Sequence, residues 1–201
     1  GVSSAASDVY KRQVQNFPIT GVPIGHYRSL IRALAVVKSA AADANYQVGE
    51  LEKDVHYAIV AACADVADGK YDNQFVVDAI QGGAGTSTNM NANEVIANRA
   101  LEIMGHKKGE YQHIHPLNHV NMSQSTNDVY PTAIKVALIL ELRELVTAMD
   151  HLRNSFASKA TEFRDVIKMG RTQLQDAVPM TLGQEFATFA RMVMELSLIH
   201  I

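Results

Sequence analysis

Apolar residues recur at steps of three and four along much of the chain, which is the spacing that places them on one face of a helix. This pattern predicts a first helix over residues 26–46 and a second over residues 51–68, with Gly69 where a helix commonly ends. A third helix is expected over about residues 91–104. The positions that carry these patterns include Leu30, Ile31, Leu34, Val37, Val55, Ile59, Val66, Val95, Ile96 and Ile103. The first half of the chain is therefore predicted to be helical.

The second half of the chain predicts longer helices. From Pro131, a residue suited to the first turn of a helix, apolar residues follow at steps of four and three to about residue 162. A helix of that length should pack along other long helices, from this chain or from partner chains. Another helix is expected to begin where Thr181 and Gln184 have the spacing of a capping box. Little strand pattern accompanies these helices, so we predict an all-α, mainly helical fold.

The two ends of the chain differ in character from the rest. Residues 1–13 (GVSSAASDVYKRQ) and 197–201 (SLIHI) resemble translated adapter sequence attached to a partial reading frame, and we expect them to be non-native flanks. The natural segment is then expected to hold an N-terminal helical domain over residues 14–127. The beginning of a helical-bundle domain is expected over residues 128–196.

Composition narrows the class of protein. With 201 residues, 47% of them hydrophobic and 19% charged, the chain has enough apolar material for one sizeable core. Its net charge of -3, without a stripe of lysine and arginine, argues against nucleic acid or an anionic membrane as a partner. No stretch approaches the roughly 20 apolar residues of a membrane span. The single cysteine, Cys63, lies in an apolar run, so we expect a buried thiol and a cytoplasmic protein.

Three segments rich in hydroxyl and amide side chains interrupt the helical pattern, at residues 81–93, 123–128 and 170–176. Each supplies short hydrogen-bond donors beside backbone N–H groups. If they face one cavity, such donors suit a small dicarboxylate, and they suit still better a carboxylate that gains a second negative charge. Ser, Thr and Asn are also the preferred helix N-caps, so capping explains any one loop about as well. Three such loops together favour a binding site.

The segments GTSTNMNANEV, SQSTNDVYPT and GRTQLQDAVPMTLGQEF closely resemble those of aspartate ammonia-lyases in the aspartase/fumarase superfamily. A looser likeness covers residues 14–196. The resemblance implies a homotetramer in which three chains contribute to each active site around long central helices. We expect no cofactor. It also implies the conversion of L-aspartate to fumarate and ammonia, by removal of a Cβ proton and formation of an enediolate.

The resemblance also assigns substrate contacts to all three loops. In chain order these are Thr86 in the first loop, Ser125, Thr126 and Asn127 in the second, and Thr172 and Gln173 in the third. Ser125 and Thr126 match the pair that binds the β-carboxylate and its enediolate form, and Asn127 matches a neighbour on the amino-group side. The family's base is a serine on a later loop that reads approximately GSSxMPxKxNP. No segment of residues 14–196 matches that loop, so no catalytic residue is assigned and the chain alone is expected to be inactive.

Two other functions remain as alternatives. Class II fumarases read GRTHTQDA in the third loop, whereas this chain has Gln173 and Leu174, as bacterial aspartases do. Because a neutral amide does not titrate near pH 7, Gln173 can orient a substrate but cannot act as an acid or base. Fumarate hydratase is thus the alternative within the same chemistry. A non-catalytic helical module that associates through its apolar seam is the alternative of another class.

The histidines of the segment HIHPLNH suggest two further sites. His113, His115 and His119 lie close together in the sequence, but their spacing fits no zinc motif and no cysteine or carboxylate completes the set, so no metal is predicted. The resemblance suggests a secondary anion site, because fumarases carry one in a segment like HPND. This chain reads HPLN there, and the matching residues are His115 and Asn118.

Overall fold

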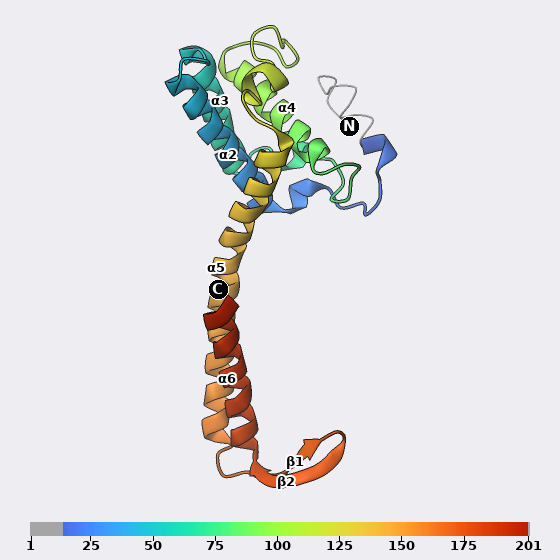
Figure 1. The fold of residues 1–201 in the computed structure, drawn as a ribbon, viewed down its shortest axis with the longest axis vertical. Coiled ribbons are helices and arrows are strands. Elements are labelled where there is room, and N and C mark those ends of the chain that lie inside the picture. The colour runs from blue at the N-terminus through green and yellow to red at the C-terminus, as the bar shows by residue number, and fades with distance from the viewer. Residues whose placement is uncertain (1–13, 201) are drawn as a thin grey trace. The chain divides into compact units, whose positions relative to one another are not determined.

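The computed structural model describes residues 14–200, with side chains through residue 196, and this part of the chain is mainly helical (Figure 1). The predicted all-α, mainly helical class is confirmed, and none of the described helices is long and apolar enough to cross a membrane. The flanks predicted at residues 1–13 and 197–201 lie outside the described side chains. The elements are η1 (Ile24–His26), α2 (Arg28–Gln47), α3 (Lys53–Ala67), η2 (Asp72–Gln74), α4 (Thr86–Ile103), the π-helix η3 (Pro116–Val120), α5 (Thr126–Glu162), β1 (Ile167–Thr172), β2 (Gln175–Thr181) and α6 (Leu182–His200).

The chain divides into two compact units, Gly1–Leu138 and Ile139–Ile201. Helix α5 begins in the first unit and continues into the second. The units follow from packing within this chain, whereas the boundary that we predict between residues 127 and 128 concerns the domains of the larger family fold. That boundary stays a prediction.

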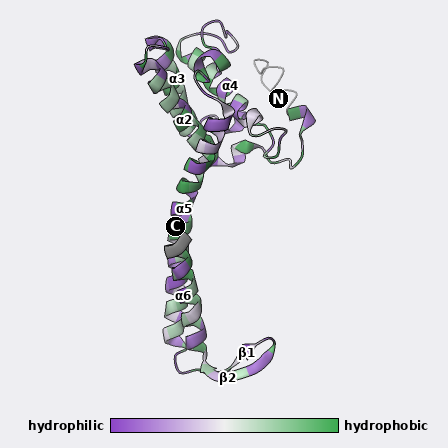
Figure 2. Ribbon diagram, viewed as in Figure 1, coloured by the Kyte–Doolittle hydropathy of each residue, from purple (hydrophilic) through white to green (hydrophobic). Residues whose placement is uncertain are grey.

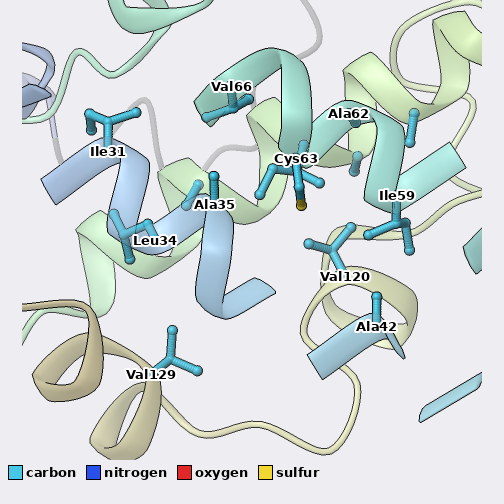
Figure 3. Packing of buried hydrophobic residues seen from close by; sticks show 14 of the residues in the cluster. Ile31, Leu34, Ala35, Ala42, Ile59, Ala62, Cys63, Val66, Val120 and Val129 are labelled. Carbon is cyan, nitrogen blue, oxygen red and sulfur yellow. The ribbon is translucent and has the colours of Figure 1, made fainter. Parts of the chain in front are cut away.

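The core of the first unit is built by α2, α3 and α4, whose apolar faces meet as their spacing predicts. Figure 3 shows Ile31 and Leu34 of α2 in one buried cluster with Ile59 and Cys63 of α3. All four are almost completely buried, and each large aliphatic side chain contributes about 1.5–3 kcal/mol of favourable transfer free energy. Val129, in the first turn of α5, is buried in the same cluster, so the core also fixes the start of the long helix.

Two helix starts differ from the prediction. Helix α4 begins at Thr86, five residues earlier than expected, so more than half of the predicted first loop is helical. Helix α5 begins at Thr126 and carries Pro131 inside the helix instead of at its start. In both cases most of the extra residues are polar and too few are apolar to show a helical period, and side-chain caps described below hold them in the helix. Helices α2 and α3 begin and end within two residues of their predicted bounds.

The second unit contains the strands that the sequence pattern did not predict. Strands β1 and β2 form an antiparallel hairpin in which Ile167 pairs with Thr181, and Thr172 pairs with Gln175. The expectation of little strand structure is confirmed, because this one small hairpin holds both described strands; the pattern did not locate it because the hairpin is short and its apolar alternation is weak. An irregularity follows Met169, at Gly170, where a Cβ atom would lie 2.8 Å from the backbone oxygen of Val178.

Within the second unit, α6 packs on the last part of α5 through aromatic rings. Phe156 lies 6.0 Å from Phe186 and 5.6 Å from Phe189 between ring centroids. The predicted capping box at the start of α6 is confirmed: Thr181 N–H donates to Oε1 of Gln184 at 2.9 Å, and Gln184 N–H donates to Oγ1 of Thr181 at 3.1 Å. Figure 2 shows apolar residues recurring along both helices.

Candidate active site

The first polar loop ends in a tight turn that only glycine can make. Gly85 has a φ of 91°, and a Cβ atom there would lie 2.2 Å from Cδ1 of Tyr130. Just before it, Gln81 takes the place of a helix cap: its Oε1 accepts the N–H of Thr88 at 2.8 Å and its Nε2 donates to the Thr88 hydroxyl at 2.8 Å. Thr86, the first residue of α4, is left exposed.

The second polar loop ends in a reciprocal cap at the start of α5. Ser125 N–H donates to Oδ1 of Asp128 at 3.1 Å, and Asn127 N–H donates to Oγ of Ser125 at 3.2 Å. Ser123 precedes the cap with a φ of 58°, a left-handed conformation that is uncommon outside glycine. The cap therefore holds Ser125, Thr126 and Asn127 together at the first turn of α5.

The structure brings these two loops together. The Nδ2 group of Asn89, in the first turn of α4, donates to the Thr126 hydroxyl at 3.1 Å, and the Tyr130 ring lies against Gly85. Two helix N-termini are thus adjacent, and helix N-termini favour anions because their N–H groups and dipoles point outward. Among the described residues, nothing accepts the hydroxyl hydrogen of Thr126 while its oxygen accepts from Asn89. That hydrogen is available to a ligand.

A layer of buried polar side chains lies behind the two loops, on the face of α4 turned to the protein interior. Three of its oxygen atoms have no partner among the described residues: Ser87 Oγ, Asn89 Oδ1 and Asn93 Oδ1. Buried polar atoms without partners are uncommon in folded proteins and often mark functional sites. Because this buried face is polar, the spacing of apolar residues predicts the start of α4 too late in the sequence. The buried polar residues of α4 are Ser87, Thr88, Asn89, Asn91, Asn93 and Glu94.

Sequence reasoning missed one charged residue of this layer. Lys38, on α2, is completely buried, and its Nζ donates to Oδ1 of Asn121 at 2.8 Å. Burial lowers the pKa of Lys38 to about 7, against the attraction of Cys63 and then of Asp128. A signal was present, because Lys38 stands four residues after Leu34 on the apolar face of the predicted helix. A lysine at a core position of a helix indicates a buried polar partner.

The third loop is the tip of the β1–β2 hairpin and belongs to the second unit. Gln173 and Leu174 have φ values of 48° and 63°, so two successive residues other than glycine adopt the left-handed conformation. Such residues cost about 1–3 kcal/mol each and cluster at functional sites. Across the hairpin, Nη1 of Arg171 lies 2.9 Å from Oδ1 of Asp176 and supports this shape. The expected contacts Thr172 and Gln173 lie side by side at the tip, both exposed.

The predicted secondary anion site falls on the π-helix η3. The Nδ1 atom of His115 accepts the N–H groups of Leu117 at 3.1 Å and of Asn118 at 3.3 Å. The Nδ1 atom of His119 accepts the N–H of His115 at 2.9 Å, and burial, followed by the nearby His115, lowers the pKa of His119. The first N–H groups of η3 are thus already bonded within the chain. The anion site at His115 and Asn118 stays a prediction.

One group of side chains in the described part of the chain has the composition of a metal site. Ligand atoms of His106, Glu110 and His113 lie within 4.8 Å of one another. The two imidazole rings are stacked, with centroids 3.8 Å apart and planes 7° from parallel. Because an ion binds close to the plane of an imidazole, the two stacked rings cannot share one ion unless one of them turns. This set differs from the three histidines considered from the sequence, of which only His113 takes part.

The chain combines a helical frame with donor-rich loops at the starts of helices, and these features agree with the family that its sequence matches. A family model described as a lyase matches residues 3–197. The chain belongs to this lyase family, and its membership of the aspartase/fumarase superfamily is confirmed.

Within the family, the curated relatives are similar over most of this chain. The aspartate ammonia-lyase of Pseudomonas aeruginosa is 64% identical over 179 residues, which cover 89% of this chain and 38% of that protein. The aspartate ammonia-lyase of Escherichia coli is 53% identical over 185 residues, which cover 92% of this chain and 39% of that protein. The chain therefore spans about two fifths of the length of these relatives.

Solved structures agree with this placement. A protein from Brucella melitensis described as fumarate lyase:delta crystallin has a TM-score of 0.92 and 55% identity, and the match covers 98% of this chain and 44% of that one. A class II fumarase from Schistosoma mansoni has a TM-score of 0.86 and 34% identity, and its match covers 98% and 41%. Both members of the superfamily thus share the fold described above.

Proposed function

We propose that the complete protein containing this chain is an aspartate ammonia-lyase, which converts L-aspartate to fumarate and ammonia. The observation that carries the proposal is the Asn89–Thr126 hydrogen bond, which holds two helix N-termini together and leaves the Thr126 hydroxyl free to donate. Two adjacent helix N-termini with a free hydroxyl donor suit the carboxylates of a dicarboxylate. The identity to curated aspartate ammonia-lyases supports aspartate among the dicarboxylates.

In this proposal, Ser125 and Thr126 bind the β-carboxylate of the substrate. A serine on the GSSxMPxKxNP loop, outside this chain, removes a proton from Cβ, and the electron pair moves onto the β-carboxylate to give an enediolate. The enediolate then collapses, the Cα–N bond breaks, and ammonia leaves as the double bond of fumarate forms. Hydroxyl donors and the N-termini of α4 and α5 stabilise the second negative charge, which is usually the largest contribution to catalysis of this kind.

The remaining residues orient the substrate. Thr86 lies at the exposed first turn of α4, and Asn127 lies beside Thr126 on the amino-group side. Thr172 and Gln173 reach the substrate from the hairpin tip, in a homotetramer where loops from three chains meet at each site. Gln173 contributes hydrogen bonds but no proton transfer, because its amide does not titrate near neutral pH.

Fumarate hydratase is the second candidate, and the likeness to the class II fumarase of Schistosoma mansoni favours it. The two candidates differ in the leaving group, which is ammonia in one and water in the other. Gln173 and Leu174 at the hairpin tip match the bacterial aspartase pattern, so we prefer aspartate as the substrate.

The test uses the complete protein, and follows the ultraviolet absorbance of fumarate with L-aspartate and, separately, with L-malate. We expect turnover of L-aspartate, and we expect Thr86→Ala to lower kcat/KM by about 100-fold, the loss typical of one donor to a developing oxyanion. Thr161→Ala is the matched control, because its hydroxyl is exposed and, among the described residues, donates to the backbone oxygen of Ala157 in its own helix. Better turnover of L-malate than of L-aspartate would overturn the preference for aspartase.

A further inference from the structure

Lys38 is a charged residue in a place where a charge is costly. It is fully buried on α2, and none of the ion pairs among the described residues includes it. Its Nζ donates instead to the neutral side chain of Asn121, at 2.8 Å. Burying an ammonium group without a paired carboxylate destabilises a fold, so this lysine calls for a role other than packing.

Asn121 is the acceptor on which the buried polar layer converges. Its Oδ1 accepts from Nζ of Lys38 at 2.8 Å, from Nδ2 of Asn89 at 3.1 Å and from Nδ2 of Asn93 at 3.2 Å. An amide oxygen has two lone pairs, so three donors, one of them an ammonium group, saturate it. The Nδ2 of Asn121 donates to the backbone oxygen of Gln124 at 3.0 Å. The two ends of this amide are therefore fixed by different partners and the group cannot turn over.

Asn89 connects Asn121 to the second loop by hydrogen bonds. Its Nδ2 carries two hydrogens and has two acceptors, Oδ1 of Asn121 and Oγ1 of Thr126, each at 3.1 Å. With Asn121 held in place, the Asn89 amide is oriented so that one N–H must point at Thr126. The Thr126 oxygen then acts as acceptor within the protein, and among the described residues no acceptor takes its own hydrogen.

Lys38 also interacts electrostatically with a residue of the second loop's cap, Asp128. Two groups attract the Lys38 ammonium and oppose the lowering of its pKa, and the first is Cys63, a thiol whose own pKa burial raises to about 12. The carboxylate that favours the ammonium form is Asp128, which caps α5 by accepting the N–H of Ser125. The charge of Lys38 is thus coupled to the cap of the second loop as well as to its hydrogen bonds.

We propose that Lys38 and Asn121 are positioning residues, which act through Asn89 to hold the Thr126 hydroxyl as a donor to the substrate's β-carboxylate. This inference rests on the proposed function for the identity of the ligand. It assigns to α2, a helix that carries none of the expected substrate contacts, control over how tightly the dicarboxylate is held.

The experiment is a double-mutant cycle in the complete protein, with succinate as an unreactive dicarboxylate probe. Dissociation constants are measured by calorimetry for the wild type, Lys38→Met, Thr126→Ala and the double variant, together with the thermal unfolding midpoint of each. We expect Lys38→Met to weaken succinate binding by about tenfold, and to have much less effect when Thr126 is already alanine, because residues in one network are coupled. Lys38→Arg, which keeps a cationic donor, should restore most of the affinity, and Lys53→Met is the matched control at an exposed lysine.

A purely structural role for Lys38 gives different results. Equal effects of Lys38→Met in both backgrounds, or unchanged succinate binding in a folded Lys38→Met protein, would overturn the proposal. Lys38→Gln, which keeps a neutral donor, is the second variant. If neither Lys38→Met nor Lys38→Gln folds while Lys38→Arg does, the lysine serves the fold alone and the proposal also fails.

The proposed function fails by a separate observation. If the wild type binds succinate but releases no fumarate from L-aspartate, the assignment as an ammonia-lyase is wrong, and the cycle still decides whether Lys38 acts on Thr126. If the wild type binds no dicarboxylate, both proposals are overturned.

Discussion

Single residues decide how closely the first two loops approach each other, and Gly85 shows this most directly. Its backbone has a φ of 91°, and the ring of Tyr130, from the first turns of α5, occupies the space where a side chain would lie. Gly105 has nearly the same backbone, with a φ of 81°, but a Cβ atom there would have no neighbour within 4 Å. A comparison of Gly85 with Gly105 therefore distinguishes the effect of backbone strain from the effect of steric contact with Tyr130.

We predict that Gly85→Ala lowers the unfolding midpoint and fumarate production far more than Gly105→Ala does. Both variants carry the strain of a left-handed alanine, about 1–2 kcal/mol. Only Gly85→Ala must also displace Tyr130 and so move the start of α5 away from α4. Thermal unfolding and aspartate turnover of the two variants check the prediction, and equal losses would show that the contact with Tyr130 does not matter.

Lys38 gives a pH dependence whose sign follows from its burial. Its pKa is lowered from 10.5 to about 7 by burial, so in this window the unfolded chain holds a proton that the folded chain has released. Stability rises with pH wherever the unfolded state binds more protons. The cost of burying Lys38 is therefore fully present below about pH 7 and shrinks as the pH rises toward 10.5.

We predict that the unfolding free energy of the wild type, relative to Lys38→Met, increases from neutral to alkaline pH. Chemical denaturation of both proteins in a series of buffers measures the difference. Curves that stay parallel across the whole range would mean that the Lys38 pKa is not lowered in the folded protein.

At the scale of whole elements, the hairpin tip is built from residues that suit the turn poorly. Two-residue turns with positive φ at both positions favour Asn-Gly, whereas this turn has Gln173 and Leu174. Leu174 is 99% exposed, so packing within this chain does not explain its presence. We infer that the tip retains strain because its side chains are needed for the substrate.

Replacing the tip by Asn-Gly should stabilise the hairpin by about 0.5–1 kcal/mol and lower aspartate turnover. The control is Leu174→Gly alone, which relieves strain at one position and keeps the Gln173 amide. Unfolding midpoints and kcat/KM for the two variants give the test. A more stable double variant with full activity would show that Gln173 has no part in binding.

The elements also show what the sequence reveals and what it hides. Helices α2 and α3 and the cap of α6 were predictable because apolar spacing and the Thr181–Gln184 pair are local signals. The starts of α4 and α5 were missed because their first turns are mostly polar and show no apolar period, although the side chains that cap them, Gln81 and Asp128, lie nearby in the sequence. Lys38 was missed although it stands on the apolar face of the predicted helix, because its partner Asn121 lies 83 residues away in the sequence.

For the molecule as a whole, the exposed leucines of α5 determine whether the chain alone associates with other copies of itself. Leu138, Leu145 and Leu152 are 47–56% exposed, and Leu142 between them is only partly buried. Together they form an apolar stripe, and such stripes mark surfaces that other chains cover. The proposed tetramer would cover this one with long helices from neighbouring chains.

We predict that the chain alone is inactive and self-associates, and that Leu145→Glu with Leu152→Glu shifts it toward monomer. Each glutamate places a charge on the stripe and raises the cost of covering it. Light scattering of both forms at several concentrations measures the shift. A clean monomer of the unmodified chain would contradict the prediction.

Helix α5 also bears on the order in which the chain acquires structure. Starting a helix is unfavourable because several residues must be fixed for the first hydrogen bond, whereas each later residue adds one bond. The first turns of α5 are capped by Ser125 and Asp128 and held by Val129 and Ala133 in the core of the first unit. The first unit therefore supplies the nucleus, and the remaining turns need only propagate from it. During synthesis, a stretch of helix is ready as a template before the chains that will bury it are present.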